Sequence, residues 1–186
     1  MTHPELYICR HGETEWNAAD RMQGWLNSPL TPNGEMQAAR QGEILRSRDL
    51  TGFTCLSSPS GRAFQTAGIA AGRLVDEIRT DDRLREISVG DWSGLYRRDL
   101  PLVEGDDPYI AQYENAPGGE GFDGLRARVQ DFLDDLTGPA LLFTHGITSR
   151  MVRSLLVGEG ALTVGTAQGG QGVVWHVKDG AQELLQ

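Results

Sequence analysis

The chain has 186 residues, a length that suits one sizeable core, so we expect a single domain spanning residues 1–186. Its formal net charge of −9 argues against a general nucleic-acid binder, because the phosphate backbone requires a positive protein face. No segment is apolar enough to cross a bilayer and the start lacks a basic region, so we expect a cytoplasmic protein with no membrane partner.

Two residue types narrow the chemistry further. Lys178 is the only lysine, so there is no Gly-Lys-Ser/Thr phosphate loop, and a Schiff base would depend on this one residue. Cys9 and Cys55 fall in separate predicted strands, where buried reduced thiols are expected. Because no metal-binding motif occurs, we expect no metal site and no cofactor.

The first half of the chain alternates strand and helix. Residues 6–9 form an apolar run typical of a buried strand. Thr31 followed by Pro32 predicts the start of a helix that continues to about Arg46. Residues 53–57 then predict a strand, and an alanine-rich helix follows at about 61–72.

The second half repeats this alternation. Apolar residues at helical spacing predict a helix over 122–136, before a strand at 140–144 and a helix from about Ile147. Residues 173–177, where Trp175 is expected in the core, and 183–185 predict a closing hairpin. This order indicates an α/β fold with a mostly parallel sheet covered by helices on both faces.

Residues 95–121 carry little regular pattern and contain three prolines and an acidic run. We interpret them either as an excursion that covers a cleft at the sheet edge or as a solvated surface loop. Arg97 and Arg98 in this segment could reach a second anionic group of a substrate, but we expect them in a charged, exposed loop.

Residues of chemical interest follow three predicted strands: His11 after the first, Arg62 after the second and His145 after the strand at 140–144. The carboxyl ends of parallel strands share one rim of a sheet, so these side chains can converge. Arg10 and Arg62 can each bind phosphoryl oxygens through a forked guanidinium group. His11 can then attack the phosphorus atom, while a protonated His145 donates a hydrogen bond to the phosphoryl group.

Phosphoryl transfer also requires an acid for the leaving oxygen. Glu86 lies in a turn-like stretch near Trp92, and burial beside a dianion would favour its protonated form. Asp82 and Asp91 compete for this role, and spacing alone does not separate the three carboxyl groups.

Several ordered motifs resemble the histidine phosphatase superfamily, in its phosphoglycerate mutase-like branch. The motifs cover most of the chain: Arg10-His11-Gly12-Glu13-Thr14 with Trp16-Asn17, Gln23-Gly24, Leu30 to Gly34, Ser57-Ser58-Pro59 with Arg62, Leu84 to Gly94, Pro117 to Glu120, and Thr144-His145-Gly146.

The resemblance implies a three-layer α/β/α sandwich and a role for each matching residue. His11 would become phosphohistidine, Glu86 would donate the proton, and Arg10, Arg62 and His145 would complete the phosphate pocket. Asn17, Gln23 and Gly24 match positions that contact the bound group or close over it, and the family uses no metal.

Two positions depart from the family pattern: Ser93 stands where many members have glutamate, and Gly121 stands where serine is common. Both departures bear on substrate choice. The sequence therefore predicts a metal-independent phosphatase of small phosphomonoesters that works through phosphohistidine. A phosphoglycerate mutase and a noncatalytic phospho-ligand-binding domain are the alternatives. The substrate and the oligomeric state are not encoded in any recognisable pattern.

Overall fold

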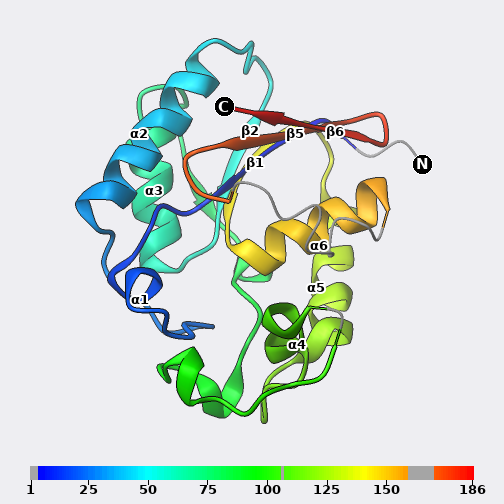
Figure 1. Ribbon diagram of the computed structural model, residues 1–186. Coiled ribbons are helices and arrows are strands. Elements are labelled where there is room, and N and C mark those ends of the chain that lie inside the picture. The colour runs from blue at the N-terminus through cyan, green and yellow to red at the C-terminus, as the bar shows by residue number, and fades with distance from the viewer. Residues whose placement is uncertain (1–3, 106, 159–169) are drawn as a thin grey trace.

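In the computed structural model, which describes residues 4–105, 107–158 and 170–186, the centre of the molecule is a mixed, mostly parallel sheet. Its strands lie in the order β3-β2-β4-β1-β5-β6 (Figure 1). Neighbouring strands from β3 to β1 are parallel, whereas β5 is antiparallel to both β1 and β6. The strands are β1 Leu6–Arg10, β2 Thr54–Ser57, β3 Arg79–Thr80, β4 Ala140–Thr144, β5 Val174–Lys178 and β6 Ala181–Leu185.

Helices cover both faces of this sheet, which confirms the predicted α/β class (Figure 1). Figure 1 shows α2 and α3 on one side and α5 and α6 on the other, with α1 and α4 at the same end of the molecule. The α-helices are α1 Glu15–Ala18, α2 Pro32–Arg46, α3 Gly61–Ala71, α4 Pro108–Glu114, α5 Gly121–Asp135 and α6 Gly146–Val157. Three short 3₁₀ helices are η1 Asp82–Leu84, η2 Gly90–Trp92 and η3 Arg97–Asp99.

The alternation of side chains along the strands divides the core into two layers. Leu6 and Ile8 of β1 join the cluster under α5 and α6, whereas Cys9 joins the cluster under α2 and α3. Cys55 lies in the same layer as Cys9, and both are buried free thiols, as predicted. Because β1 and β4 have core side chains on both faces, the ends of these strands are held firmly in place.

Local sequence signals explain the helices that carry the fold. The Thr31 hydroxyl accepts a hydrogen bond from Gly34 N at 3.0 Å, and Pro32 occupies the first turn of α2, as predicted. In α5 the apolar residues Leu125, Val129 and Phe132 are buried at helical spacing. The predicted hairpin is formed by β5 and β6.

The sequence pattern missed the short elements. The pattern gave no signal for α1, β3 or α4, because a two-residue strand or a one- to two-turn helix has too few positions to show a period. Within the described residues, no helix is both long and apolar enough to cross a membrane.

Candidate active site

Two buried histidines meet at the carboxyl ends of β1 and β4. His11 N donates a hydrogen bond to Thr144 O at 3.0 Å, which extends the parallel pairing of the two strands by one residue. The imidazole rings of His11 and His145 are 5.1 Å apart between centroids, with an interplanar angle of 63°. Parallel pairing therefore brings together two residues that are far apart in sequence.

The ring of His11 is held with one nitrogen available for attack. Nδ1 lies 2.7 Å from Gly12 O, a carbonyl that can only accept, so Nδ1 carries the proton. Nε2 accepts a hydrogen bond from Arg62 Nε at 3.2 Å. A nucleophilic imidazole needs this arrangement, in which a hydrogen-bond acceptor orients its second nitrogen.

The surroundings of His11 keep its imidazole neutral. Burial, together with the positive charges of Arg62 and Arg10, holds its pKa well below the ordinary value for histidine. A neutral ring has a lone pair on Nε2, whereas a protonated ring has none. The same arginines that could bind a phosphoryl group therefore also keep the imidazole of His11 in the form that could act as a nucleophile.

Arg62 comes from the first turn of α3 and is 1% exposed. Its Nη1 donates to Leu26 O at 2.6 Å and its Nη2 donates to Gly24 O at 2.9 Å. Burial lowers its pKa to about 10, so the side chain remains charged at neutral pH. Two backbone carbonyls thus fix the guanidinium plane, and Nε is directed at His11.

Arg10, the last residue of β1, lines the same pocket as His11. Its buried Nε has no hydrogen-bond partner within the described residues. A buried guanidinium N–H without an acceptor fits a group that binds an anion.

His145 lies behind this pocket and is fully buried. Its Nε2 lies 2.8 Å from Ser58 Oγ, and its Nδ1 has no partner within the described residues. Burial and the charge of Arg62 lower its pKa well below the ordinary value. The protonated form expected from the sequence is therefore disfavoured in the ligand-free pocket, and a bound dianion would be needed to favour it.

Glu86 is fixed by the N-terminus of α6. Its Oε1 accepts hydrogen bonds from the backbone N and the hydroxyl of Thr148, both at 3.1 Å, and its Oε2 accepts from Ile147 N at 3.2 Å. The carboxylate is 7% exposed and lines the pocket with His11 and Arg62. Its competitors lie elsewhere, since Asp82 is an exposed partner of Arg85 and Asp91 is also exposed.

A partly buried ion pair fixes the segment that carries Glu86. Arg128 of α5 donates to Glu86 O at 3.0 Å and to Arg83 O at 2.6 Å, and it pairs with Glu120 at 2.8 Å. Glu120 also accepts from Ser88 N at 2.7 Å. The Pro117 to Glu120 motif therefore acts through the backbone around Glu86.

Asn17, Gln23 and Gly24 line the same pocket. Asn17 Oδ1 accepts from Thr14 N at 3.2 Å, in a capping box at the start of α1. Gln23 Nε2 donates to Thr14 Oγ1 at 2.9 Å. The three residues are thus beside His11, although in this state Asn17 and Gln23 bond to the protein itself.

Arg97, Tyr109 and Tyr113 from segment 95–121 form another wall of the pocket. Arg97 is 8% exposed, packs 3.8 Å from the Tyr109 ring and donates to Tyr113 Oη at 2.6 Å. The expectation of an exposed loop is therefore wrong for Arg97 and correct for Arg98, whose side chain is 76% exposed. The sequence analysis missed both tyrosines, because α4 gave no periodic signal.

No group of three or more histidine, cysteine or acidic side chains that could hold a metal ion occurs among the residues that the structure describes. The pocket instead presents guanidinium groups from Arg10, Arg62 and Arg97 together with the carboxylate of Glu86. Such a set of groups suits a phosphoryl group that is bound without a metal bridge.

Comparison with known proteins identifies close relatives. The family model described as "Histidine phosphatase superfamily (branch 1)" matches residues 6–173. A relative named "Probable phosphoglycerate mutase GpmB", from Salmonella choleraesuis, is 37% identical over 83% of this chain and 75% of its own. The crystal structure of TTHB049 from Thermus thermophilus is 33% identical, with a TM-score of 0.71, and the match covers 94% of this chain and 93% of that one. Bacillus stearothermophilus YhfR is 30% identical, with a TM-score of 0.73 over 97% of this chain and 95% of its own.

Proposed function

The chain belongs to the histidine phosphatase superfamily (branch 1), and on that premise we propose that it hydrolyses small phosphomonoesters through a phosphohistidine formed on His11. The observation that carries the proposal is the state of His11. Its Nδ1 is fixed by Gly12 O, and its Nε2 faces a pocket lined by Arg10 and Arg62.

In the first step, a phosphate ester enters with its nonbridging oxygens toward Arg10 and Arg62. The Arg62 Nε–H, which hydrogen-bonds to His11 Nε2 in the free protein, turns its hydrogen bond to a phosphoryl oxygen. Glu86 takes up a proton when the dianionic ester binds. His11 Nε2 then forms a bond to phosphorus as the ester P–O bond breaks, and Glu86 gives this proton to the departing alkoxide. The dianion favours the protonated form of His145, which then donates a hydrogen bond to it.

In the second step, water attacks the phosphohistidine. Glu86, now a carboxylate, takes a proton from this water, the N–P bond breaks, and inorganic phosphate leaves. The electron pair of the N–P bond returns to His11 Nε2. One water is consumed and one alcohol and one phosphate are released, so the enzyme returns to its starting protonation state.

Hydrolysis is proposed over mutase transfer because of the chain's own features. The segment 95–121 contributes one seven-residue α-helix as cover. A mutase must keep water away from the phosphoenzyme, which calls for a more extensive cover than one short helix. The GpmB relative, which is named a mutase, makes transfer between phosphoglycerates the second candidate. Phosphate release exceeding isomer formation from either phosphoglycerate supports hydrolysis, and the reverse ratio supports the mutase.

A noncatalytic binding domain is the third reading of the pocket. Binding of a phosphoryl group needs only the arginines, whereas a neutral imidazole with a lone pair on Nε2 and a nearby carboxyl group serve bond formation. The presence of both groups beside Arg62 supports catalysis.

Trapping of the covalent intermediate tests this proposal. A ³²P-labelled aryl phosphate, quenched after a short incubation, should leave a base-stable, acid-labile label on the wild-type protein. His11→Ala should remove the label. His176→Ala is the matched control, because His176 pairs with Glu5 outside the pocket, and it should retain the label. A folded wild-type protein that releases no phosphate and takes no label would contradict catalysis.

A further inference from the structure

We propose that a second anion-binding subsite, formed by Arg150, Arg153 and Ser149 of α6, adjoins the phosphate pocket, and that the natural substrate carries a second acidic group that binds there. The inference rests on the proposed function for the first phosphoryl group. The second group is a carboxylate or another phosphoryl group. The residues that form this subsite played no part in the assignment of the active site.

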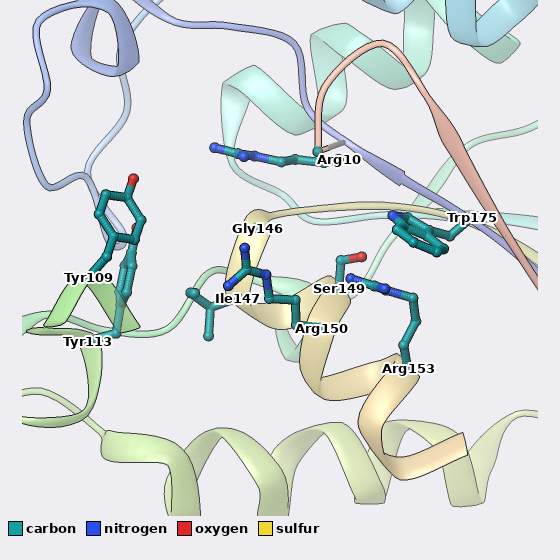
Figure 2. A pocket seen from close by; sticks show the side chains of 10 residues that line it. Arg10, Tyr109, Tyr113, Gly146, Ile147, Ser149, Arg150, Arg153 and Trp175 are labelled. Atoms are coloured by element: carbon teal, nitrogen blue, oxygen red, sulfur yellow. The ribbon is translucent and has the colours of Figure 1, made fainter. Parts of the chain in front are cut away.

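A distinct pocket on the α6 side of Arg10 contains these residues (Figure 2). The residues that line it are Arg10, Tyr109, Tyr113, Gly146, Ile147, Ser149, Arg150, Arg153, Gly170 and Trp175. Arg10, Tyr109 and Tyr113 also line the phosphate pocket. A single ligand that occupies both pockets would therefore contact Arg10 from each of them.

Helical spacing places the new residues on one face of α6. Gly146, Arg150 and Arg153 are separated by four and three residues, so they lie above one another along the helix. Figure 2 shows the side chains of Arg150 and Arg153 projecting from α6 on the side where Arg10 lies. The positive groups therefore surround a common space.

Two glycines make room for Arg10 between the pockets. A Cβ at Gly146 would lie 3.4 Å from Arg10 Cζ, and a Cβ at Gly170 would lie 2.6 Å from Arg10 Nη1. A side chain at Gly170 would require the guanidinium group to move. The backbone at Gly146 and Gly170 therefore leaves room for the guanidinium group of Arg10, which lines both pockets.

The two arginines of α6 lack the partners that buried cations usually have. Arg153 is 3% exposed and donates to Gln182 Oε1 at 3.0 Å, yet its Nε is buried without a partner. Arg150 Nη1 is also buried and has no hydrogen-bond partner within the described residues. Unpaired buried guanidinium N–H groups are costly, and an anion would satisfy them.

The electrostatics agree with this geometry. Burial and the neighbouring charge of Arg10 lower the pKa of Arg150, and burial and the charge of Arg150 lower the pKa of Arg153 to about 10. Both remain cationic at neutral pH and repel one another. An anion between them would relieve that repulsion.

The other residues that line the second pocket indicate which part of the substrate joins its two acidic groups. Trp175 was expected in the core, but it is only partly buried, and its ring packs 4.0 Å from the Arg153 guanidinium group. Together with Ile147 and the two tyrosine rings it gives the pocket an apolar side. A short carbon chain between the phosphoryl group and the second acid fits these walls.

Binding of unreactive phosphonates tests the subsite separately from catalysis, because a C–P bond is not hydrolysed. Isothermal titration calorimetry would compare propylphosphonate with 3-phosphonopropionate and propane-1,3-diphosphonate, and then with longer members of each series. At least one ligand with a second acid should bind about tenfold or more tightly than the matched alkylphosphonate. The tighter of the two series identifies the second group.

Arg150→Gln and Arg153→Gln should each remove most of that preference and weaken alkylphosphonate binding far less. Arg46→Gln, at an exposed site on α2, is the control and should keep the wild-type preference. Thermal unfolding would verify that each variant folds. If Arg153→Gln does not fold, because its bond to Gln182 is lost, Arg150→Gln still decides the question.

Equal affinity of the wild-type protein for alkylphosphonates and both difunctional series would overturn the subsite, as would an unchanged preference in Arg150→Gln. Neither result touches the proposed function, which depends on the phosphohistidine label. Conversely, a missing label with a clear preference for difunctional phosphonates would leave the subsite standing and reject catalysis. No binding of any phosphonate would overturn the subsite and leave the proposed function to be decided by the label.

Discussion

The phosphate-binding side of the pocket and its cover are built by different means. His11, Arg62 and Glu86 are each positioned by backbone groups: Gly12 O, the carbonyls of Leu26 and Gly24, and the first N–H groups of α6. The cover, segment 95–121, is joined to the rest of the protein by backbone bonds near its ends, such as Arg97 N to Asp20 O at 3.0 Å, but its pocket wall is held by side chains, chiefly Arg97 against Tyr109 and Tyr113. The difference teaches that His11, Arg62 and Glu86 are fixed by backbone groups around the carboxyl ends of the strands, whereas the wall formed by α4 can change without altering the sheet.

Replacement of Glu86, the proposed acid, should have the largest effect on activity. Glu86→Gln keeps the shape of the side chain but removes the transferable proton, so hydrolysis of alkyl phosphates should slow by about 10²- to 10⁴-fold in kcat. Aryl phosphates, which have better leaving groups, should slow much less. Steady-state kinetics on both classes would check this, and equal slowing would remove Glu86 from the role of acid.

Arg62→Lys tests whether the forked geometry matters beyond charge. A lysine cannot bond to Leu26 O, Gly24 O and His11 together, so kcat/KM should fall by about 10²- to 10³-fold while the positive charge remains. Kinetics with an aryl phosphate would measure the loss. A change smaller than threefold would mean that charge alone suffices at this position.

Gly12→Ala tests whether close packing of the backbone holds His11 in place. A Cβ at Gly12 would collide with the carbonyl oxygen of Gly34, so the backbone that carries His11 must shift. We expect the free energy of unfolding to fall by about 1–3 kcal/mol, as measured by denaturant titration. Gly52→Ala, where a Cβ meets no atom, controls for the loss of glycine, although its own positive φ of 80° adds local strain.

The two buried histidines, His11 and His145, should make the stability of the protein depend on pH. Both have a folded-state pKa lowered below the ordinary value, so the unfolded chain binds more protons as the pH falls below about 6.5. Stability should therefore decrease from pH 7 to pH 5, with a limiting slope of about 1.4 kcal/mol per pH unit for each histidine. Denaturant titrations across this range would measure the slope, and His145→Asn should reduce it. A slope unaffected by this substitution would contradict a neutral, buried His145.

A substitution in the cover should have the smallest effect, and it should change KM rather than kcat. Arg97→Met keeps the apolar stem but loses the contact with the Tyr109 ring and the bond to Tyr113, so KM should rise about fivefold with little change in kcat. Arg98→Met is the matched control, because the neighbouring side chain is 76% exposed, and it should behave as the wild type. A large loss of kcat in Arg97→Met would erase the distinction between the two regions.

Much of the fold could be predicted from the sequence, because long helices and strands repeat their pattern of apolar residues. The helix over residues 32–46 and the strand over 140–144 were predicted with their observed ends, because capping residues and proline mark those ends directly. The structure of segment 95–121 could not be predicted from the sequence, because α4 spans only seven residues and takes its position from contacts with Arg97.

The sequence by itself determined the alternation of strands and helices and, through ordered motifs, the set His11, Arg62, Glu86 and His145. Only the tertiary structure decided which side chains face one another: the tautomer of His11, the neutral ring of His145 in the free pocket, and the buried position of Arg97. The reason is physical. Periodicity and capping act between residues a few positions apart, whereas burial, charge and hydrogen bonding at this site depend on strands that become neighbours only on folding.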